Sequence, residues 1–130
     1  MEIFRDYDIR GEYPDDINDE IAYKISRSIA KLLKTKNLVI GRDISLNSPK
    51  IHDALVNGAI DSGVDVTDIG LAGTDVVYFA TGFYKFDSGI EVTASHSAGH
   101  LSGLKIAGPK AQIFIGKGSG MEDLKKLYEN

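Results

Sequence analysis

The fold of this chain is decided by residues 38–69, LVIGRDISLNSPKIHDALVNGAIDSGVDVTDI. Residues 38–40 are apolar and predict a short buried strand. Ser48-Pro49 predicts an N-cap followed by proline at the first helical position, with a helix that runs to about residues 62–63. Residues 64–69 then alternate in polarity as a second strand does. A strand, a helix and a strand in this order indicate a crossover connection between parallel strands.

The same alternation of elements continues on both sides of this unit. Before it, apolar residues recur at helical spacing from Ile17 to Leu33 behind an acidic start, which predicts an amphipathic helix that ends near Thr35. After it, the pattern predicts a shorter helix, a strand, a hairpin or two edge strands, and a closing helix, at residues 74–84, 90–93, 104–106 with 112–115, and 121–128. We therefore expect one domain over residues 1–130, a three-layer α/β/α structure with a mostly parallel, mixed sheet.

Composition narrows the possible partners. The 130 residues are 42% hydrophobic and 26% charged, with a net charge of −4, and the 15 Lys and Arg residues are scattered. A nucleic-acid partner is not expected, because no basic stripe exists to follow a phosphate backbone. Neither an uninterrupted apolar span for a membrane nor a leader pattern at the N-terminus is seen, so we expect a cytoplasmic protein with no membrane partner. The absence of cysteine excludes disulfides and thiolate metal sites.

A hydroxyl and an amine stand close together after the strand at residues 90–93. The run Thr93-Ala94-Ser95-His96 follows this strand, and Gly103-Leu104-Lys105 comes shortly afterwards. Loops beyond the carboxyl ends of strands are where open α/β sheets bind ligands. Two interpretations remain open on this pattern: Ser95 is a nucleophile, or its hydroxyl only satisfies a turn.

Other chemistries fit less well. His96 is adjacent to Ser95 and points away from it on an extended chain, and no Gly-x-Ser-x-Gly motif surrounds the serine, so a hydrolase triad is disfavoured. His52 is expected on a helix surface, and His96 could share a metal with His100 only if the loop bent sharply. The glycine-rich run 116–120 is similar to a phosphate cradle but matches neither known fingerprint, which leaves a flexible turn or a small nucleotide site.

Four separated segments resemble one family. They are FRDYDIRG at residues 4–11, GRD at 41–43, TASH at 93–96 and GLK at 103–105. In this order and spacing they are similar to the first of the four domains of the α-D-phosphohexomutases, which include phosphoglucomutase and phosphomannomutase. The resemblance covers nearly the whole chain and is far more specific than any single motif.

The resemblance implies roles for five residues. Ser95 would be the serine that is phosphorylated and exchanges phosphate with hexose phosphates. Lys105 resembles the family's general acid or base, and His96 follows the serine as it does in the family. Tyr7 and Arg10 resemble residues that line the same cleft around the hexose phosphate substrate.

The resemblance also implies Mg²⁺. In the family its protein ligands come from a loop of the second domain, so that in this chain only a phosphoserine oxygen on Ser95 could contribute to the metal. One oxygen is far below the six-fold shell that Mg²⁺ prefers. We therefore expect the chain to be inactive alone and to work with the remaining mutase domains, in cis or in trans.

The chain departs from the family pattern in several places. Ser97-Ala98 stands where the family has Asn-Pro, Leu101-Ser102 where it has Tyr-Asn, and Ser45 where it has arginine. Gly73-Thr74-Asp75 replaces a Pro-Thr-Pro segment. Loss of prolines relaxes a backbone. An alternative is therefore a free-standing, non-catalytic relative that binds a sugar phosphate or a protein partner.

Overall fold

The computed structural model of the chain describes residues 2–94, 101–114 and 120–130. These residues form a six-stranded sheet and four α-helices. The strands are β1 (Ile9–Glu12), β2 (Asn37–Arg42), β3 (Asp65–Leu71), β4 (Ser88–Thr93), β5 (Leu101–Gly108) and β6 (Gln112–Ile113). The helices are α1 (Asp19–Leu33), α2 (Ser48–Asp61), α3 (Thr74–Phe83) and α4 (Met121–Glu129).

The sheet is mixed, with the strand order β1-β5-β4-β2-β3 and with β6 paired to β5. β2 pairs in parallel with β3 and with β4, as crossover connections through α2 and α3 require. β5 is antiparallel to β1, β4 and β6. Of the two arrangements open for residues 104–106 and 112–115, the hairpin is the one found as far as the described residue 114, because β5 and β6 pair antiparallel. The predicted α/β class is confirmed.

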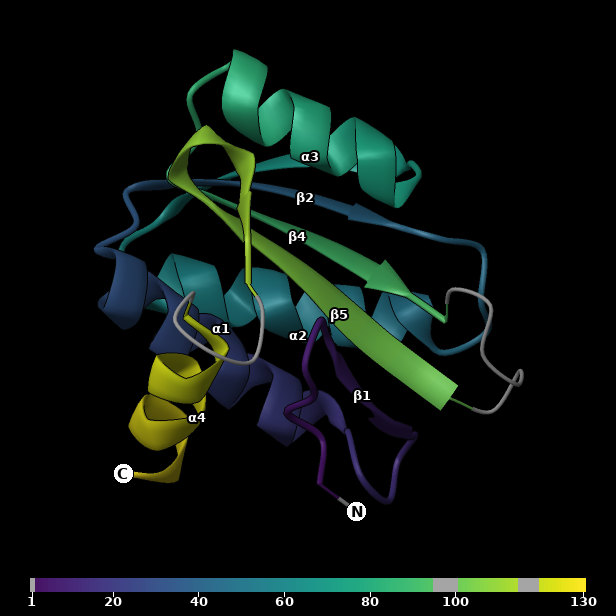
Figure 1. The fold of residues 1–130 in the computed structure, drawn as a ribbon. Helices are drawn as coiled ribbons and strands as arrows, with labels where there is room; N and C mark the ends of the chain where they lie inside the picture. Colours follow the sequence, from purple (N-terminus) through teal and green to yellow (C-terminus); the bar gives the residue numbers. More distant parts are fainter. Residues whose placement is uncertain (1, 95–100, 115–119) are drawn as a thin grey trace.

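Three layers are visible in Figure 1: α1, α2 and α4 lie on one side of the sheet and α3 on the other. The main apolar core fills the space between the sheet and the first group of helices. Its members include Ile25, Ile51, Leu55, Ile90 and Leu104, all almost completely buried. No helix within the described ranges combines the length and the apolarity that crossing a membrane requires.

The first two helices begin differently. Asn18 caps α1, since its side-chain oxygen accepts a hydrogen bond of 2.9 Å from the Ile21 amide. The N-cap of α2 is Asn47, not the predicted Ser48, and Asn47 makes no side-chain capping bond. The Ser48 hydroxyl instead donates to Asp43 Oδ1 at 2.6 Å. The Ser48 side chain, which the sequence pattern assigns to the cap, therefore bonds to a residue outside the helix.

The sheet sorts its residues onto two faces. In β4 and β5 the apolar residues Ile90, Val92, Leu104 and Ile106 belong to the core under α1 and α2. The alternating residues face the side of α3. Gly89, for example, leaves room for Thr81 and Val77 of α3. Glu91, Thr93 and Lys105 alternate with the apolar residues and therefore belong to this second face.

Candidate functional site

Three charged side chains meet where β1 and β5 pair. Arg10 lies opposite Gly103, and a side chain at position 103 would come within 3.0 Å of the Arg10 guanidinium. The glycine therefore allows the arginine to lie over β5. Asp8 Oδ2 accepts hydrogen bonds from Arg10 Nη2 at 2.7 Å and from Arg10 Nε at 3.2 Å. Lys105 Nζ lies 3.5 Å from the same oxygen.

Arg10 is almost completely buried, with 6% of its surface exposed. Its Nη1 donates a hydrogen bond of 2.7 Å to the carbonyl oxygen of Ala94, which directly precedes Ser95. A buried guanidinium needs partners on all sides, and the carboxylate and the carbonyl supply them. The arginine thus connects β1 to the carboxyl end of β4.

Asp43 holds the same end of β4 from the other side. Its Oδ2 accepts hydrogen bonds from the Ala94 amide at 2.8 Å and from Thr93 Oγ1 at 3.0 Å. Burial alone would raise the pKa of Asp43, but hydrogen bonds from Ser48, Ala94 and Ser45 outweigh it and hold the pKa below its ordinary value. The carboxylate is therefore ionised at neutral pH.

Glu91 lies on the same face, one pleat before Thr93, and is only 1% exposed. Gly41 makes room for it, because a side chain at position 41 would come within 2.9 Å of Glu91 Oε1. That oxygen has no hydrogen-bond partner among the described residues. Burial, followed by the charges of Asp43 and Asp75, raises the pKa of Glu91 to about 8. Glu91 is thus protonated at neutral pH.

Tyr78 lies near enough to Asp8 and Glu91 to feel the charge of both. It lies on α3 and is partly buried. Burial raises the pKa of its phenol, and the charges of Asp8 and Glu91 raise it further. The hydroxyl therefore stays neutral beside both groups of acidic residues.

The structure brings some of the predicted residues together and leaves others apart or undescribed. Arg10 and Lys105 share one carboxylate, Asp8. Tyr7 is 67% exposed. Ser95 and His96 lie outside the described residues, which reach Ala94 on this side of the loop.

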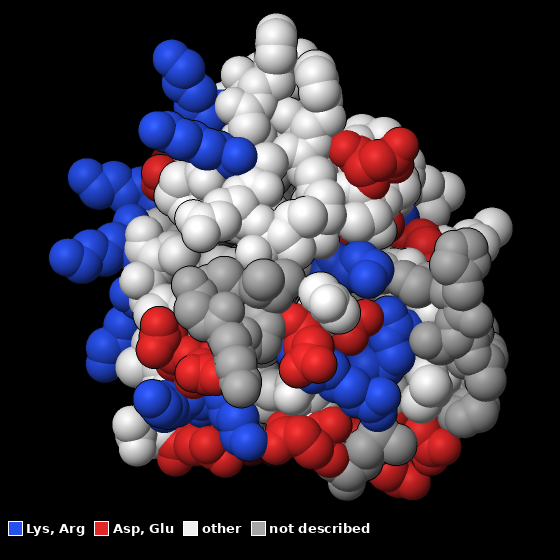
Figure 2. Space-filling view, viewed as in Figure 1, with Lys and Arg blue, Asp and Glu red and all other residues white. Residues whose placement is uncertain are grey.

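The charged residues lie on a face that differs in character from end to end. Figure 2 shows side chains of both signs next to one another in the lower half of this view, where Figure 1 places β1 and the start of β5. The upper part is white along its middle, with blue side chains at its left edge and a red group at its right. Asp8, Arg10 and Lys105 form a cluster of paired charges at this end of the sheet.

Comparison with known proteins decides the family. A family model described as phosphoglucomutase/phosphomannomutase, alpha/beta/alpha domain I, matches residues 1–117. The chain belongs to the phosphoglucomutase/phosphomannomutase family. It is 43% identical to a phosphomannomutase of Klebsiella pneumoniae over 97% of this chain and 80% of that protein. A phosphomannomutase of Escherichia coli is also 43% identical over 97% of this chain, but only 27% of that protein is covered.

The fold of the family agrees with the structure. A crystal structure of a phosphoglucomutase/phosphomannomutase family protein from Burkholderia thailandensis superposes with a TM-score of 0.85 and 29% identity. The match covers 98% of this chain and 29% of that one. The chain thus spans less than a third of the length of these longer family members, and it corresponds to their domain I.

Sequence patterns missed several residues of this family domain that shape the site. Asp8 lies in the FRDYDIRG motif and Asp43 in the GRD motif, but the motifs alone assign neither residue a role. Glu91 carried a usable signal, because it is a lone charge in the apolar run Ile90-Glu91-Val92. A carboxyl group in such a strand is either exposed on one face or buried with a shifted pKa, and the pattern alone does not say which.

His52 corrects another expectation. Rather than lying on the helix surface, it is 6% exposed, on the side of α2 that faces the end of β3. Its ring contacts two carboxylates, with Nδ1 3.0 Å from Asp53 Oδ1 and Nε2 3.1 Å from Asp68 Oδ2. The residue connects α2 to β3 and plays no part in the cluster around Arg10. The glycine-rich run is described only at Gly120, so the proposed cradle lies outside the described residues.

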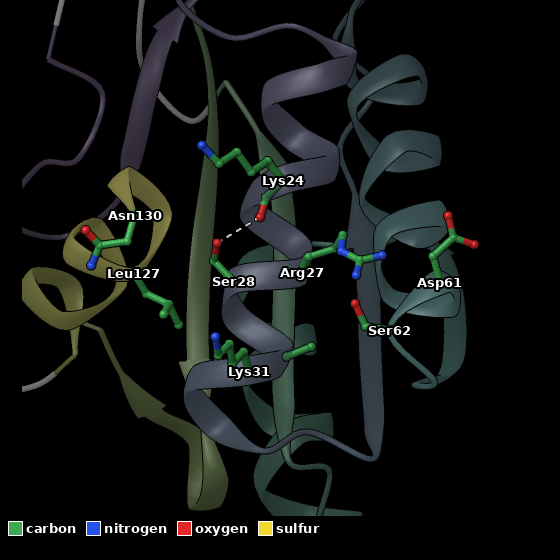
Figure 3. A pocket seen from close by; sticks show the side chains of 9 residues that line it. Lys24, Arg27, Ser28, Lys31, Asp61, Ser62, Leu127 and Asn130 are labelled. Atoms are coloured by element: carbon green, nitrogen blue, oxygen red, sulfur yellow. Dashed lines mark hydrogen bonds between the residues drawn. The ribbon is translucent and has the colours of Figure 1, made fainter.

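A groove on the far side of the sheet has a different character. It has a volume of about 510 Å³ and lies between α1, the end of α2 and α4. Figure 3 shows the side chains that line it, among them Lys24, Arg27, Lys31 and Asp61. None of the candidate residues lines this groove. It is a surface hollow between helices and is separate from the site.

Proposed function

We propose that this chain is the phosphoserine-bearing, N-terminal domain of a phosphohexomutase, with Ser95 as the phosphoryl carrier and a hexose phosphate as the substrate. One observation carries the proposal: the Ala94 peptide next to Ser95 is held between Asp43 and Arg10, and Arg10 shares Asp8 with Lys105. A strand end that is fixed in this way, with two cations nearby, is suited to carry a residue for phosphoryl transfer.

The proposed step exchanges one P–O bond for another. The bond between phosphorus and Ser95 Oγ breaks, and a bond forms between phosphorus and a hydroxyl oxygen of the sugar phosphate. The sugar hydroxyl loses its proton and Ser95 Oγ gains one, so that charge and atoms balance. Lys105 is the proposed proton carrier, because its Nζ can give up or take one proton beside the reacting oxygens. Arg10 is the proposed cation for the phosphoryl oxygens, and His96 and Tyr7 are proposed to line the cleft.

The described residues do not supply a magnesium site. No three His, Cys, Asp or Glu side chains among them converge to hold a metal ion. The two Asp43 oxygens already accept hydrogen bonds from N–H and O–H groups. Any Mg²⁺ would therefore need oxygen ligands beyond these residues, and we propose that a Ser95 phosphate and the remaining mutase domains provide them.

Intact-mass measurement of the chain, after incubation with a hexose bisphosphate, Mg²⁺ and the remaining domains of a family member supplied in trans, tests the carrier. We expect one phosphate adduct, mapped to Ser95 by fragmentation. Ser95→Ala should abolish the adduct, while the matched variant Ser97→Ala, in the same loop, should retain it. An adduct that survives in Ser95→Ala would contradict the assignment.

A mutase assay of the isolated chain with glucose 1-phosphate or mannose 1-phosphate tests incompleteness. We expect no turnover, because the proposed metal and sugar sites lie in other domains. Full turnover without a partner would contradict this part of the proposal.

The departures at Ser97-Ala98 and Leu101-Ser102 favour a second candidate, a non-catalytic relative that binds a sugar phosphate or a protein. The mass experiment separates the two. A chain that binds glucose 1-phosphate but never takes up phosphate at Ser95 would be a binding domain.

A further inference from the structure

Asp43 is the most heavily hydrogen-bonded side chain of the site. It follows β2, and its amide donates to the Val92 carbonyl at 2.9 Å. Its carboxylate accepts five hydrogen bonds. Oδ1 accepts from the Ser45 amide at 3.0 Å and from Ser48 Oγ at 2.6 Å. Oδ2 accepts from Ser45 Oγ at 2.9 Å and from two groups of β4 and its end.

Those two groups are Thr93 Oγ1 and the Ala94 amide, at 3.0 and 2.8 Å. The other side of the Ala94 residue is fixed as well, because its carbonyl accepts from Arg10 Nη1 at 2.7 Å. Both backbone groups of Ala94 therefore end on charges of opposite sign, the half-buried Asp43 and the buried Arg10, which come from two other parts of the chain. Charge-assisted bonds of this kind are short and strong.

Ser45 gives this arrangement a feature particular to the chain. The resemblance places an arginine at this position, and the serine stands as a departure from the family pattern. In the structure both its amide and its hydroxyl donate to Asp43. The serine therefore adds a hydroxyl donor to the Asp43 carboxylate and connects Asp43 to the turn before α2.

We propose that Asp43 is a positioning residue for phosphoryl transfer: it fixes the Thr93–Ala94 segment, and with it the point at which the backbone passes to Ser95. The inference rests on the proposed role of Ser95. A small displacement of a reacting group costs much of the rate, so a carrier serine needs a fixed backbone on its N-terminal side. Asp43 does not touch the reacting atoms.

A carboxylate near a phosphorylated serine would ordinarily oppose it by charge repulsion. Here the five hydrogen-bond donors stabilise the ionised form of Asp43 and spread its charge. The acid group of Glu91 on the same face keeps its proton at neutral pH, as described above, so only one of these two carboxyls is charged. The arrangement thus holds the backbone with one negative charge instead of two.

The test uses the 130-residue chain and two substitutions at one position. Asp43→Ala removes all five acceptor contacts. Asp43→Asn can keep one oxygen towards Thr93 and Ala94, but it then turns its amide group towards another donor, the Ser45 N–H. We expect amide hydrogen exchange at Ala94 to accelerate at least tenfold in Asp43→Ala and less in Asp43→Asn. Exchange at Val39 in the sheet should stay within about twofold of the wild type.

Phosphorylation of Ser95 by a hexose bisphosphate and Mg²⁺, with the remaining mutase domains supplied in trans, is the functional readout. Its rate should fall at least tenfold in Asp43→Ala, with partial rescue in Asp43→Asn. Asp65→Asn, which changes an exposed carboxylate at the start of β3, is the matched control and should leave both readouts unchanged. If Asp43→Ala does not fold, the pH dependence of the Ala94 amide proton chemical shift decides. In the wild type this shift should follow the titration of the Asp43 carboxyl group at acidic pH, and in Asp43→Asn the dependence should be absent.

Each failure has its own signature. Unchanged exchange at Ala94, or equal acceleration at Ala94 and Val39, would overturn the positioning role. So would faster exchange at Ala94 with undiminished phosphorylation. A wild-type chain that never accepts phosphate at Ser95 would overturn the proposed function instead, while the exchange result would still decide whether Asp43 fixes Ala94.

Discussion

Single residues on the α3 face show how environment separates two chemically similar groups. Asp43 and Glu91 are both acidic, but five donors surround the first and none is within reach of Oε1 of the second among the described residues. The pKa of Asp43 is lowered, and that of Glu91 is raised to about 8. Hydrogen bonds to the ionised form lower the pKa of Asp43, whereas burial without such bonds raises the pKa of Glu91.

The raised pKa of Glu91 predicts a pH dependence of stability. The folded chain keeps a proton that the unfolded chain releases above its ordinary pKa of 4.5, so the free energy of unfolding should fall as pH rises from about 4.5 to about 8. Glu91→Gln mimics the protonated acid and should remove this fall. At pH 8 it should stabilise the chain by roughly 1–3 kcal/mol.

Urea unfolding at pH 5, 6.5 and 8 measures the effect. Glu122→Gln, an exposed glutamate of α4, is the control and should keep the wild-type slope. A Glu91→Gln variant with the same slope as the wild type would show that Glu91 is ionised in the folded chain.

At the scale of elements, local patterns predict the helices well and the sheet partly. α1 lies where its apolar spacing and acidic start place it, because both signals are local. β1 was not predicted, since its four residues include a charged Arg10 and a glycine and are held by pairing with β5. The pairing partner is distant in the chain, so short sequence windows carry no sign of it.

The helix caps provide a matched pair of variants. Asn18→Ala removes the hydrogen bond to the Ile21 amide and should destabilise the chain by about 1 kcal/mol. Asn47→Ala, at the N-cap of α2, removes no side-chain capping bond and should cost less than half as much. Thermal or urea unfolding of both variants measures the difference. Equal losses would mean that the Asn18 bond contributes nothing in solution.

At the scale of the whole molecule, the two faces of the sheet are covered unequally. Three helices cover one face, whereas α3 is the one α-helix on the other among the described residues (Figure 1). Several exposed side chains of α3 are apolar. Phe79 and Phe83 are stacked with their ring centroids 5.1 Å apart, and Tyr84 packs edge-on against Phe83. Phe83 is 65% exposed. We call Val76, Phe79, Phe83 and Tyr84 the α3 aromatic surface.

The α3 aromatic surface predicts self-association of the isolated chain, because soluble proteins rarely leave contiguous aromatic side chains in water. Sedimentation velocity over a concentration series should show a reversible dimer. The double change Phe79→Ser and Phe83→Ser should weaken it at least tenfold, about 1.4 kcal/mol. Leu46→Ser, which removes an exposed apolar side chain outside α3, should not. A chain that is monomeric at every concentration would contradict the prediction.

The sequence by itself determined the α/β class, the helices and the family, because apolar periodicity and short motifs are local properties of the chain. It also indicated Arg10 and Lys105 as members of one site. The tertiary structure decided what surrounds them: Asp8 between the two cations, Asp43 and Arg10 on opposite sides of Ala94, and Glu91 buried beside Gly41. Strand order and pleat bring these groups together, and no local pattern encodes the pairing of distant strands or the pKa of a group that the pairing buries.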